Sequence, residues 1–238
     1  MTKPLFSNSR LTAHDTCPLM WSYNYIENIS GESNFYAHYG TFAHLIFELF
    51  ALGKIDNPFE VWINHYQKRV LDRTNPHEIP PWEKKWKAEG SWFFDEFKGF
   101  EGETVWTEQH ILLGFEMFKF QGFVDRLESR GKDLVMIDFK SSKPFIKKDI
   151  EQKGRQMYLY SRGVKEMLGK YPKQLEFLHF RQNKKTVIDF SLKEYNAAVD
   201  WAKRKVDEIL EAEEFPANPN YFFCDNICNF RNICNQKG

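Results

Sequence analysis

The feature that most constrains the fold is a change in the pattern of apolar residues near Glu103. Before it, apolar side chains recur at helical spacing, and after it three consecutive segments are rich in β-branched and aromatic residues. Turn signals stand at Gly114 and Gly131. The three segments are 105–115, 118–128 and 134–139. Helices followed by three strands predict an α/β domain around a small mixed sheet.

Helical periodicity and turn residues locate the other elements. Ser9 is the expected N-cap of the first helix, and Gly53 is expected to end the second. The expected helices are 9–29, 35–52, 58–71, 81–97, 148–168 and 192–212, and two further strands are expected at 174–181 and 186–190 with Asn183 in the turn. We expect one domain over 1–238, with a mainly helical part at 1–100, a core at 101–213 and a cysteine-rich tail at 214–238.

Composition is that of an ordinary globular protein, with 42% hydrophobic and 28% charged residues. No run approaches the roughly 18 apolar residues that span a bilayer, and the N-terminus lacks the apolar core of a signal peptide. We therefore expect a cytosolic protein that does not enter a membrane. The formal net charge is zero, so charge does not point to a nucleic-acid partner, although a local basic path would be enough to bind one.

Two carboxylates and a lysine lie in the second and third expected strands. Asp125 stands in GFVDR, and Asp138 and Lys140 stand in IDFKS, where strand alternation places them on one face. Charged residues among apolar neighbours are costly to bury unless they are paired or bind a metal, and a divalent cation relieves the repulsion between two carboxylates. Spacing alone favours an ordinary salt bridge on a half-solvated strand over a metal site.

Two further motifs also have two interpretations when taken alone. His44, in GTFAH, is a lone histidine on an apolar helix and fits a hydrogen-bonded core residue as well as a ligand. Gln156 and Tyr160, in QMYLY, lie one helical turn apart and fit a surface pair as well as a functional one. Neither motif decides the function by itself.

Taken in order, these motifs resemble the PD-(D/E)XK nuclease superfamily. The sequence G-x-V-D-R, followed thirteen residues later by D-F-K, is similar to its RecB-like branch. Gly40 and His44 resemble the helical histidine motif of that branch, and Gln156 and Tyr160 resemble its Q-x-x-x-Y motif. Glu108 on the first strand matches an acidic position often seen there. The resemblance implies a restriction-endonuclease-like core with a small mixed sheet flanked by helices.

The resemblance also implies a metal-dependent DNA exonuclease that hydrolyses phosphodiester bonds, acting on single-stranded DNA or DNA ends in recombination, repair or replication. One or two Mg²⁺ or Mn²⁺ ions would be held by Asp125, Asp138, His44 and the Phe139 carbonyl. Lys140 would orient or deprotonate the attacking water or stabilise charge in the transition state. Gln156 and Tyr160 would position that water or the DNA backbone.

The chain has four cysteines, of which one is close to the N-terminus and three lie within eleven residues near the C-terminus. They are Cys17, Cys224, Cys228 and Cys234. A disulfide framework is not expected in a cytosolic chain of this size. The spacing leaves open an iron–sulfur cluster, a zinc site and free buried thiols.

This layout resembles the AddB-type nucleases and the CRISPR-associated exonucleases, in which one cysteine precedes the histidine motif and three follow the core. The segment CPLMWSYNY around Cys17 is similar to their cysteine-proline-aromatic signature. The resemblance implies that Cys17, Cys224, Cys228 and Cys234 bind a [4Fe–4S] cluster that ties the tail to the first helix. The competing hypotheses are a catalytically silent DNA-binding or scaffold subunit with the same fold, and a zinc-stapled protein.

Overall fold

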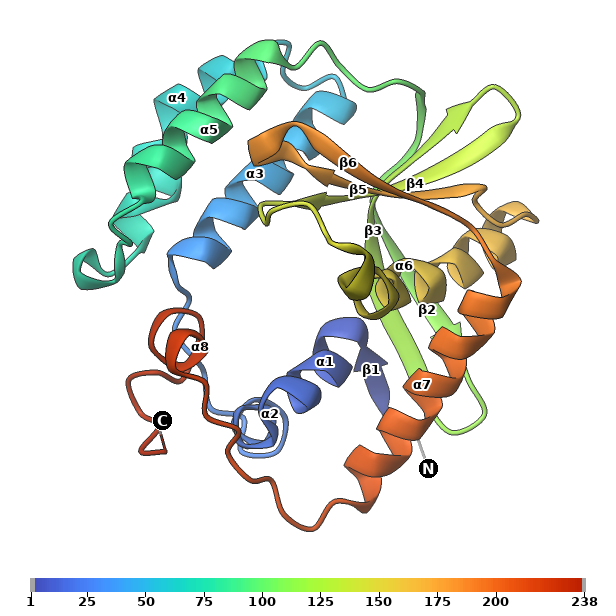
Figure 1. Cartoon of the computed structure of the whole chain (residues 1–238). Helices are drawn as coiled ribbons and strands as arrows, with labels where there is room; N and C mark the ends of the chain where they lie inside the picture. The colour runs from blue at the N-terminus through green and yellow to red at the C-terminus, as the bar shows by residue number, and fades with distance from the viewer. Residues whose placement is uncertain (1–2, 237–238) are drawn as a thin grey trace.

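A computed structural model describes residues 3–236 of the chain (Figure 1). The outermost residues of the expected domain therefore lie outside the described part. The strands are β1 Leu5–Ser7, β2 Glu103–Gly114, β3 Lys119–Arg130, β4 Asp133–Lys140, β5 Gln174–His179 and β6 Lys184–Asp189. The helices are α1 Asn8–Thr16, α2 Pro18–Tyr25, α3 Phe35–Ala51, α4 Pro58–Arg69, α5 Glu83–Glu96, α6 Lys147–Leu168, α7 Leu192–Glu211 and α8 Tyr221–Asn226. Short 3₁₀ turns cover Leu71–Arg73, Pro76–Glu78 and Phe180–Gln182.

All six strands form one mixed sheet, in the order β1-β3-β4-β5-β6 with β2 on the other edge of β3. β2 pairs antiparallel with β3 along most of its length. The opposite edge of β3 is shared, because β1 pairs with residues 119–121 and β4 with residues 126–130. Within residues 3–236, the edge of β3 between these two segments therefore has no strand partner. β1 pairs parallel with β3, and β4 pairs parallel with β5 through the crossover helix α6.

Helices cover both faces of the sheet (Figure 1). On one face α3, α4 and α5 enclose an aromatic-rich core with the alternating β4 residues Val135, Ile137 and Phe139. On the other face α1, α6 and α7 pack against a second core that takes in the intervening residues Leu134 and Met136. The expected α/β fold with a mixed sheet flanked by helices is confirmed. None of the helices within residues 3–236 has the length and apolar run needed to cross a membrane.

Most expected elements agree with the observed ones to within a few residues, but the first helix differs. The single helix expected over 9–29 is wrong, because α1 ends at Thr16 and α2 begins at Pro18. Cys17 between them is extended, with φ −161° and ψ 107°, as the residue before a proline usually is. The N-cap is Ser7, whose hydroxyl accepts a hydrogen bond from the Arg10 amide, so the expected cap at Ser9 is also wrong.

Candidate active site

The two aspartates lie where β3 and β4 separate. The last paired residues are Arg126 and Ile137, and the next position on each strand is Asp125 and Asp138. Oδ2 of Asp125 accepts a hydrogen bond from the Phe139 amide at 2.9 Å. This side-chain hydrogen bond satisfies the amide at the point where the backbone hydrogen bonds between β3 and β4 end. Both predicted carboxylates thus come together at the fork between two strands.

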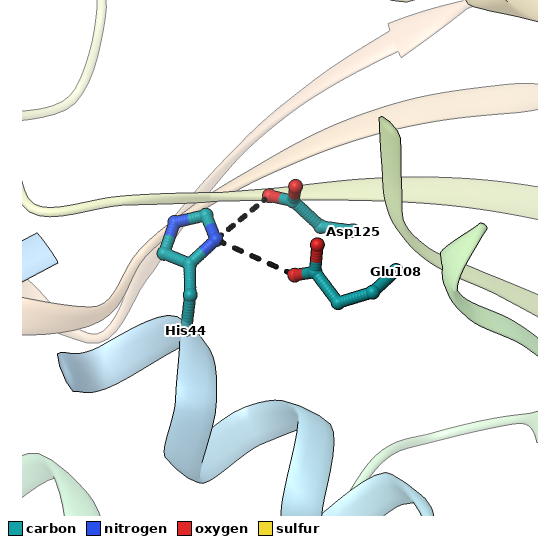
Figure 2. A group of neighbouring side chains, drawn as sticks. All are labelled: His44, Glu108 and Asp125. Carbon is teal, nitrogen blue, oxygen red and sulfur yellow. Dashed lines mark ion pairs between the residues drawn. The ribbon is translucent and has the colours of Figure 1, made fainter. Parts of the chain in front are cut away.

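A histidine and two carboxylates meet on the α3 side of this fork (Figure 2). Nδ1 of His44 lies 3.5 Å from Oδ2 of Asp125 and 3.8 Å from Oε1 of Glu108. Nε2 of His44 lies 3.0 Å from the Phe139 carbonyl oxygen, which can only accept, so we assign the ring proton to Nε2. Nδ1 is then the nitrogen directed at the carboxylates.

Asp138 faces α6, on the other side of the sheet from His44. Its Oδ1 accepts a hydrogen bond from Nε2 of Gln156 at 3.0 Å, and Nζ of Lys140 lies 2.5 Å from Oδ2. Despite this ion pair, the buried Oδ2 forms no hydrogen bond of suitable geometry with the described residues. Strand alternation correctly predicts that Asp138 and Lys140 share a face, and Gln156 joins them from α6.

Crowding of charge perturbs the ionisation of this group. Burial and the neighbouring Asp138 raise the pKa of Asp125 to about 7, although His44 and Lys140 oppose the shift. Burial lowers the pKa of His44, but Asp125, Glu108 and Asp138 outweigh it and raise the pKa to about 9. Burial likewise lowers the pKa of Lys140, and the two aspartates more than offset it, so the pKa is raised. An added cation would relieve this excess of buried negative charge.

Tyr160 lies one helical turn beyond Gln156 and packs over the unpaired edge of β3. A Cβ added to Gly122 would lie 2.2 Å from Cε1 of the Tyr160 ring, so the ring and the strand backbone are in close contact. Burial and the charges of Asp138 and Asp125 raise the pKa of Tyr160. The hydroxyl therefore stays protonated and available as a donor.

Glu108 is the residue that the predicted ligand set omits. Among residues 3–236, the only histidine, cysteine and carboxylate side chains that gather in a group of three or more within 4.8 Å are His44, Glu108 and Asp125. Asp138 lies outside that group. The register of β2 places Glu108 opposite Asp125, and its φ of 45° is in the left-handed region that such residues rarely adopt. In the sequence, Glu108 can be recognised by its match to the acidic position often seen in the branch that the motifs resemble.

The four cysteines line one cavity between α2 and the C-terminal tail. Three of the sulfurs accept backbone hydrogen bonds: Cys17 from Asn218 at 3.5 Å, and Cys224 and Cys228 from Asn220 and Phe230 at 3.4 Å. In the part of the chain that the structure describes, no three cysteine sulfurs all lie within 4.8 Å of one another. The resemblance implies that Cys17 joins the other three, and in the structure all four cysteines line this cavity.

The tail is ordered by contacts on both sides of this cavity. The Leu19 amide donates to the Pro216 carbonyl at 3.2 Å, and the buried Arg231 guanidinium pairs with Glu78. The short helix α8 and these contacts lie within the cysteine-rich tail expected at 214–238. Figure 1 shows the tail passing α2 on its way from α7 to α8.

Comparison with known proteins gives the following. The family model described as the PD-(D/E)XK nuclease superfamily matches residues 5–235. No curated protein matches the chain. A crystal structure described as a "Putative exonuclease" from Eubacterium rectale is 13% identical, with a TM-score of 0.52, and the match covers 98% of this chain and 90% of that one. A crystal structure of SSO0001 is also 13% identical, with a TM-score of 0.45, covering 100% of this chain and 89% of that one.

Proposed function

The chain belongs to the PD-(D/E)XK nuclease superfamily, and from this premise we propose that it is a metal-dependent deoxyribonuclease that removes nucleotides from single-stranded DNA or DNA ends. The observation that carries the proposal is the gathering of His44, Glu108 and Asp125 beside Asp138 and Lys140 at one strand fork. We assign it to recombination, repair or replication, the processes in which free DNA ends are handled.

The donor set fits a divalent cation. The carboxylates of Glu108 and Asp125 and the imidazole of His44 lie together. The Asp138 carboxylate lies on the adjacent strand, and its buried Oδ2 is paired with Lys140 but forms no hydrogen bond of suitable geometry with the described residues. We propose that His44, Glu108, Asp125, Asp138 and the Phe139 carbonyl hold one or two ions. Oxygen donors suit Mg²⁺, and the imidazole suits Mn²⁺ at least as well. A bound ion would lower the pKa of a water and shield charge on the scissile phosphate.

The remaining side chains have separate roles. Lys140 carries a raised pKa, so it is a cation that orients the attacking water and stabilises negative charge on the phosphate, in preference to acting as a base. Gln156 holds the Asp138 carboxylate by its amide. Tyr160, protonated and on the same side of α6, would donate a hydrogen bond from its hydroxyl to the water or to the DNA backbone.

Digestion of end-labelled DNA tests this assignment. Single- and double-stranded oligonucleotides labelled at the 5′ or 3′ end are incubated with Mg²⁺ or Mn²⁺, using wild type, Asp138→Ala and Asp133→Ala. Asp133 lies at the outer end of the same strand and pairs with Lys173, so its variant is the matched control. We expect Asp138→Ala alone to abolish hydrolysis. Equal activity of wild type and Asp138→Ala would show that the proposed centre is wrong.

We further propose that Cys17, Cys224, Cys228 and Cys234 hold a [4Fe–4S] cluster that staples the tail to the first helices. Backbone amides directed at three sulfurs suit thiolate ligands, which need hydrogen bonds when buried. A tetrahedral zinc site with bonds of about 2.3 Å would bring the sulfurs to about 3.8 Å from one another. Among the described residues no three of these sulfurs lie within 4.8 Å of one another, so this zinc geometry is not preformed. The four cysteines line one cavity and would supply the four thiolates of a [4Fe–4S] cluster.

Anaerobic purification with iron, sulfide and zinc analysis tests the cluster. We expect iron and acid-labile sulfide in equal amounts in the wild-type protein and a large loss of both in Cys228→Ser. The melting temperature of that variant should fall, because the cluster closes a loop of about two hundred residues. Zinc in place of iron would assign the four cysteines to a zinc staple, and unchanged stability in Cys228→Ser would contradict the structural role.

A further inference from the structure

An aromatic residue lies open to solvent next to the proposed metal centre. Phe123 is two residues before Asp125 on β3, so strand alternation puts both side chains on the same face of the sheet. The Phe123 side chain is 52% exposed, and Leu112, on the neighbouring strand, is 55% exposed. Because Phe123 and Leu112 lie on neighbouring strands beside the proposed metal centre, they are a candidate contact surface for a ligand.

The Phe123 ring is held in place by its neighbours. His110, its cross-strand partner on β2, packs against the ring with centroids 4.9 Å apart and planes tilted by 40°. Nε2 of His110 donates to Oε1 of Gln121 at 3.2 Å, which fixes the imidazole. We refer to His110, Gln121 and Phe123 as the β2–β3 platform. Its members already contact one another without a ligand, and such pre-organisation reduces the entropy lost on binding.

The platform borders a groove that leads to the metal centre. Asp125, Gln156, Tyr160 and residues 7–9 line this groove together with the platform residues Gln121 and Phe123, and its volume is about 390 Å³. Residues 7–9 contribute two hydroxyls and one amide and no charge. Beyond Asp125 the outward positions of β3 carry Phe123, Gln121 and finally the exposed Lys119. A surface with neutral donors, an aromatic ring and a cation suits a polyanion with planar bases.

We propose that the β2–β3 platform binds an unpaired nucleotide adjacent to the scissile phosphate, with its base stacked on Phe123. This inference rests on the proposed nuclease function and gives its substrate class as single-stranded or frayed DNA. Aromatic rings bind every base through its π-face, so the contact tolerates any sequence. Bases inside a duplex are already stacked on each other, so an intact duplex cannot use the platform.

Three substitutions of Phe123 test whether the contact depends on an aromatic ring or only on apolar surface area. Phe123→Trp retains a ring, Phe123→Leu retains only apolar area, and Phe123→Ala removes both. Trp92→Ala is the matched control, because Trp92 is 50% exposed and lies on α5, which contributes nothing to the metal centre. We expect Phe123→Ala and Phe123→Leu to raise KM for single-stranded DNA about tenfold with little change in kcat, and Phe123→Trp and Trp92→Ala to match wild type.

A spectroscopic readout distinguishes stacking from other uses of the surface. The probe is a single-stranded oligonucleotide with one 2-aminopurine, bound in Ca²⁺. Stacking should quench its fluorescence in wild type, Phe123→Trp and Trp92→Ala, and not in Phe123→Ala or Phe123→Leu. Equal quenching and equal KM in Phe123→Ala would overturn the proposal. A change in oligomeric state in Phe123→Ala would also overturn it, by assigning the surface to contacts between copies of the chain.

Failure of this proposal is separable from failure of the nuclease assignment. If wild type and Asp138→Ala both leave DNA intact, the nuclease assignment is wrong, and the proposed role of the platform is wrong as well. If wild type degrades DNA, Asp138→Ala does not, and Phe123→Ala behaves as Trp92→Ala does, only the platform is wrong. A KM increase in Phe123→Ala that is equally large for blunt duplex DNA contradicts the preference for unpaired bases.

Discussion

The Phe139 amide donates a hydrogen bond to Oδ2 of Asp125 over 2.9 Å, across the point where β3 and β4 cease to pair. This bond fixes the Asp125 side chain, and on the other side of Phe139 the carbonyl oxygen is in contact with Nε2 of His44. One peptide segment of β4 thus orients a carboxylate from β3 and an imidazole from α3. The centre is built on the strand backbone, which accounts for its position at the fork.

Because the Asp125 carboxylate is buried, we expect its negative charge to destabilise the metal-free protein. The pKa of Asp125 is about 7 when folded against an ordinary value of 3.8, so stability falls as pH rises from about 4 to about 7 and stays low above that range. Asp125→Asn keeps an oxygen for the Phe139 amide and removes the charge. In EDTA, we expect this variant to melt higher than wild type at pH 8, with a smaller difference at pH 5, and to have no nuclease activity.

Asp133→Asn is the control for that comparison, since its carboxylate is surface-exposed and paired with Lys173. It should melt no higher than wild type at either pH. A metal-free Asp125→Asn that melts below wild type at pH 8 would contradict the electrostatic argument.

Metal binding should strengthen with pH. In the metal-free protein the pKa of His44 is about 9 and that of Asp125 is about 7, and both protons must leave before these groups can act as ligands. The rise in melting temperature caused by a fixed Mn²⁺ concentration should therefore grow from pH 6 to pH 8.5, and calorimetry in buffers of different ionisation enthalpy should show proton release. His44→Ala should lose most of the growth above pH 7. A pH-independent shift in wild type would rule out His44 as a ligand.

The sequence predicts the centre well where strand alternation alone determines the geometry. Asp138 and Lys140 share a face because they are two residues apart on a strand, and Asp125 lies on the adjacent strand of the hairpin. His44 and Gln156 come from helices, and only the resemblance of their motifs links them to those strands. Their approach depends on tertiary packing that no local pattern contains.

Local backbone features account for what the sequence analysis misses. Glu108 reaches the centre through a left-handed φ and the register of β2, neither of which a strand pattern predicts. β1 has only three residues and exists because β3 offers an open edge at residues 119–121. The break at Pro18 is different, because proline and the residue before it are recognisable helix limits and the expected helix over 9–29 ignores them.

Two substitutions of Glu108 test its role as a metal ligand separately from the strain in its backbone. Glu108→Gln removes the charge and keeps the shape, and Glu108→Gly also relieves the positive φ of 45°, which costs of the order of 1 kcal/mol in other residues. We expect both variants to bind Mn²⁺ about tenfold or more weakly, and Glu108→Gly to be the more stable of the two in EDTA. Glu103→Gln, at the exposed outer end of β2, is the control. Wild-type Mn²⁺ affinity in Glu108→Gln would remove Glu108 from the ligand set.

The close contact between Gly122 and Tyr160 predicts that a larger side chain at position 122 lowers both the stability and the activity of the protein. A Cβ at residue 122 would lie 2.2 Å from Cε1 of the Tyr160 ring, and the ring is buried, so Gly122→Ala must displace the ring, α6 or the strand. We expect a loss of about 1–3 kcal/mol of stability by denaturant unfolding and a large loss of activity. Gly114→Ala, in the same hairpin with nothing within 4 Å of the added atom, should leave both unchanged. In a double-mutant cycle, Tyr160→Ala should cancel part of the destabilisation caused by Gly122→Ala, because the clash disappears when the ring is removed. Additive effects of the two substitutions would show that the residues are not in contact.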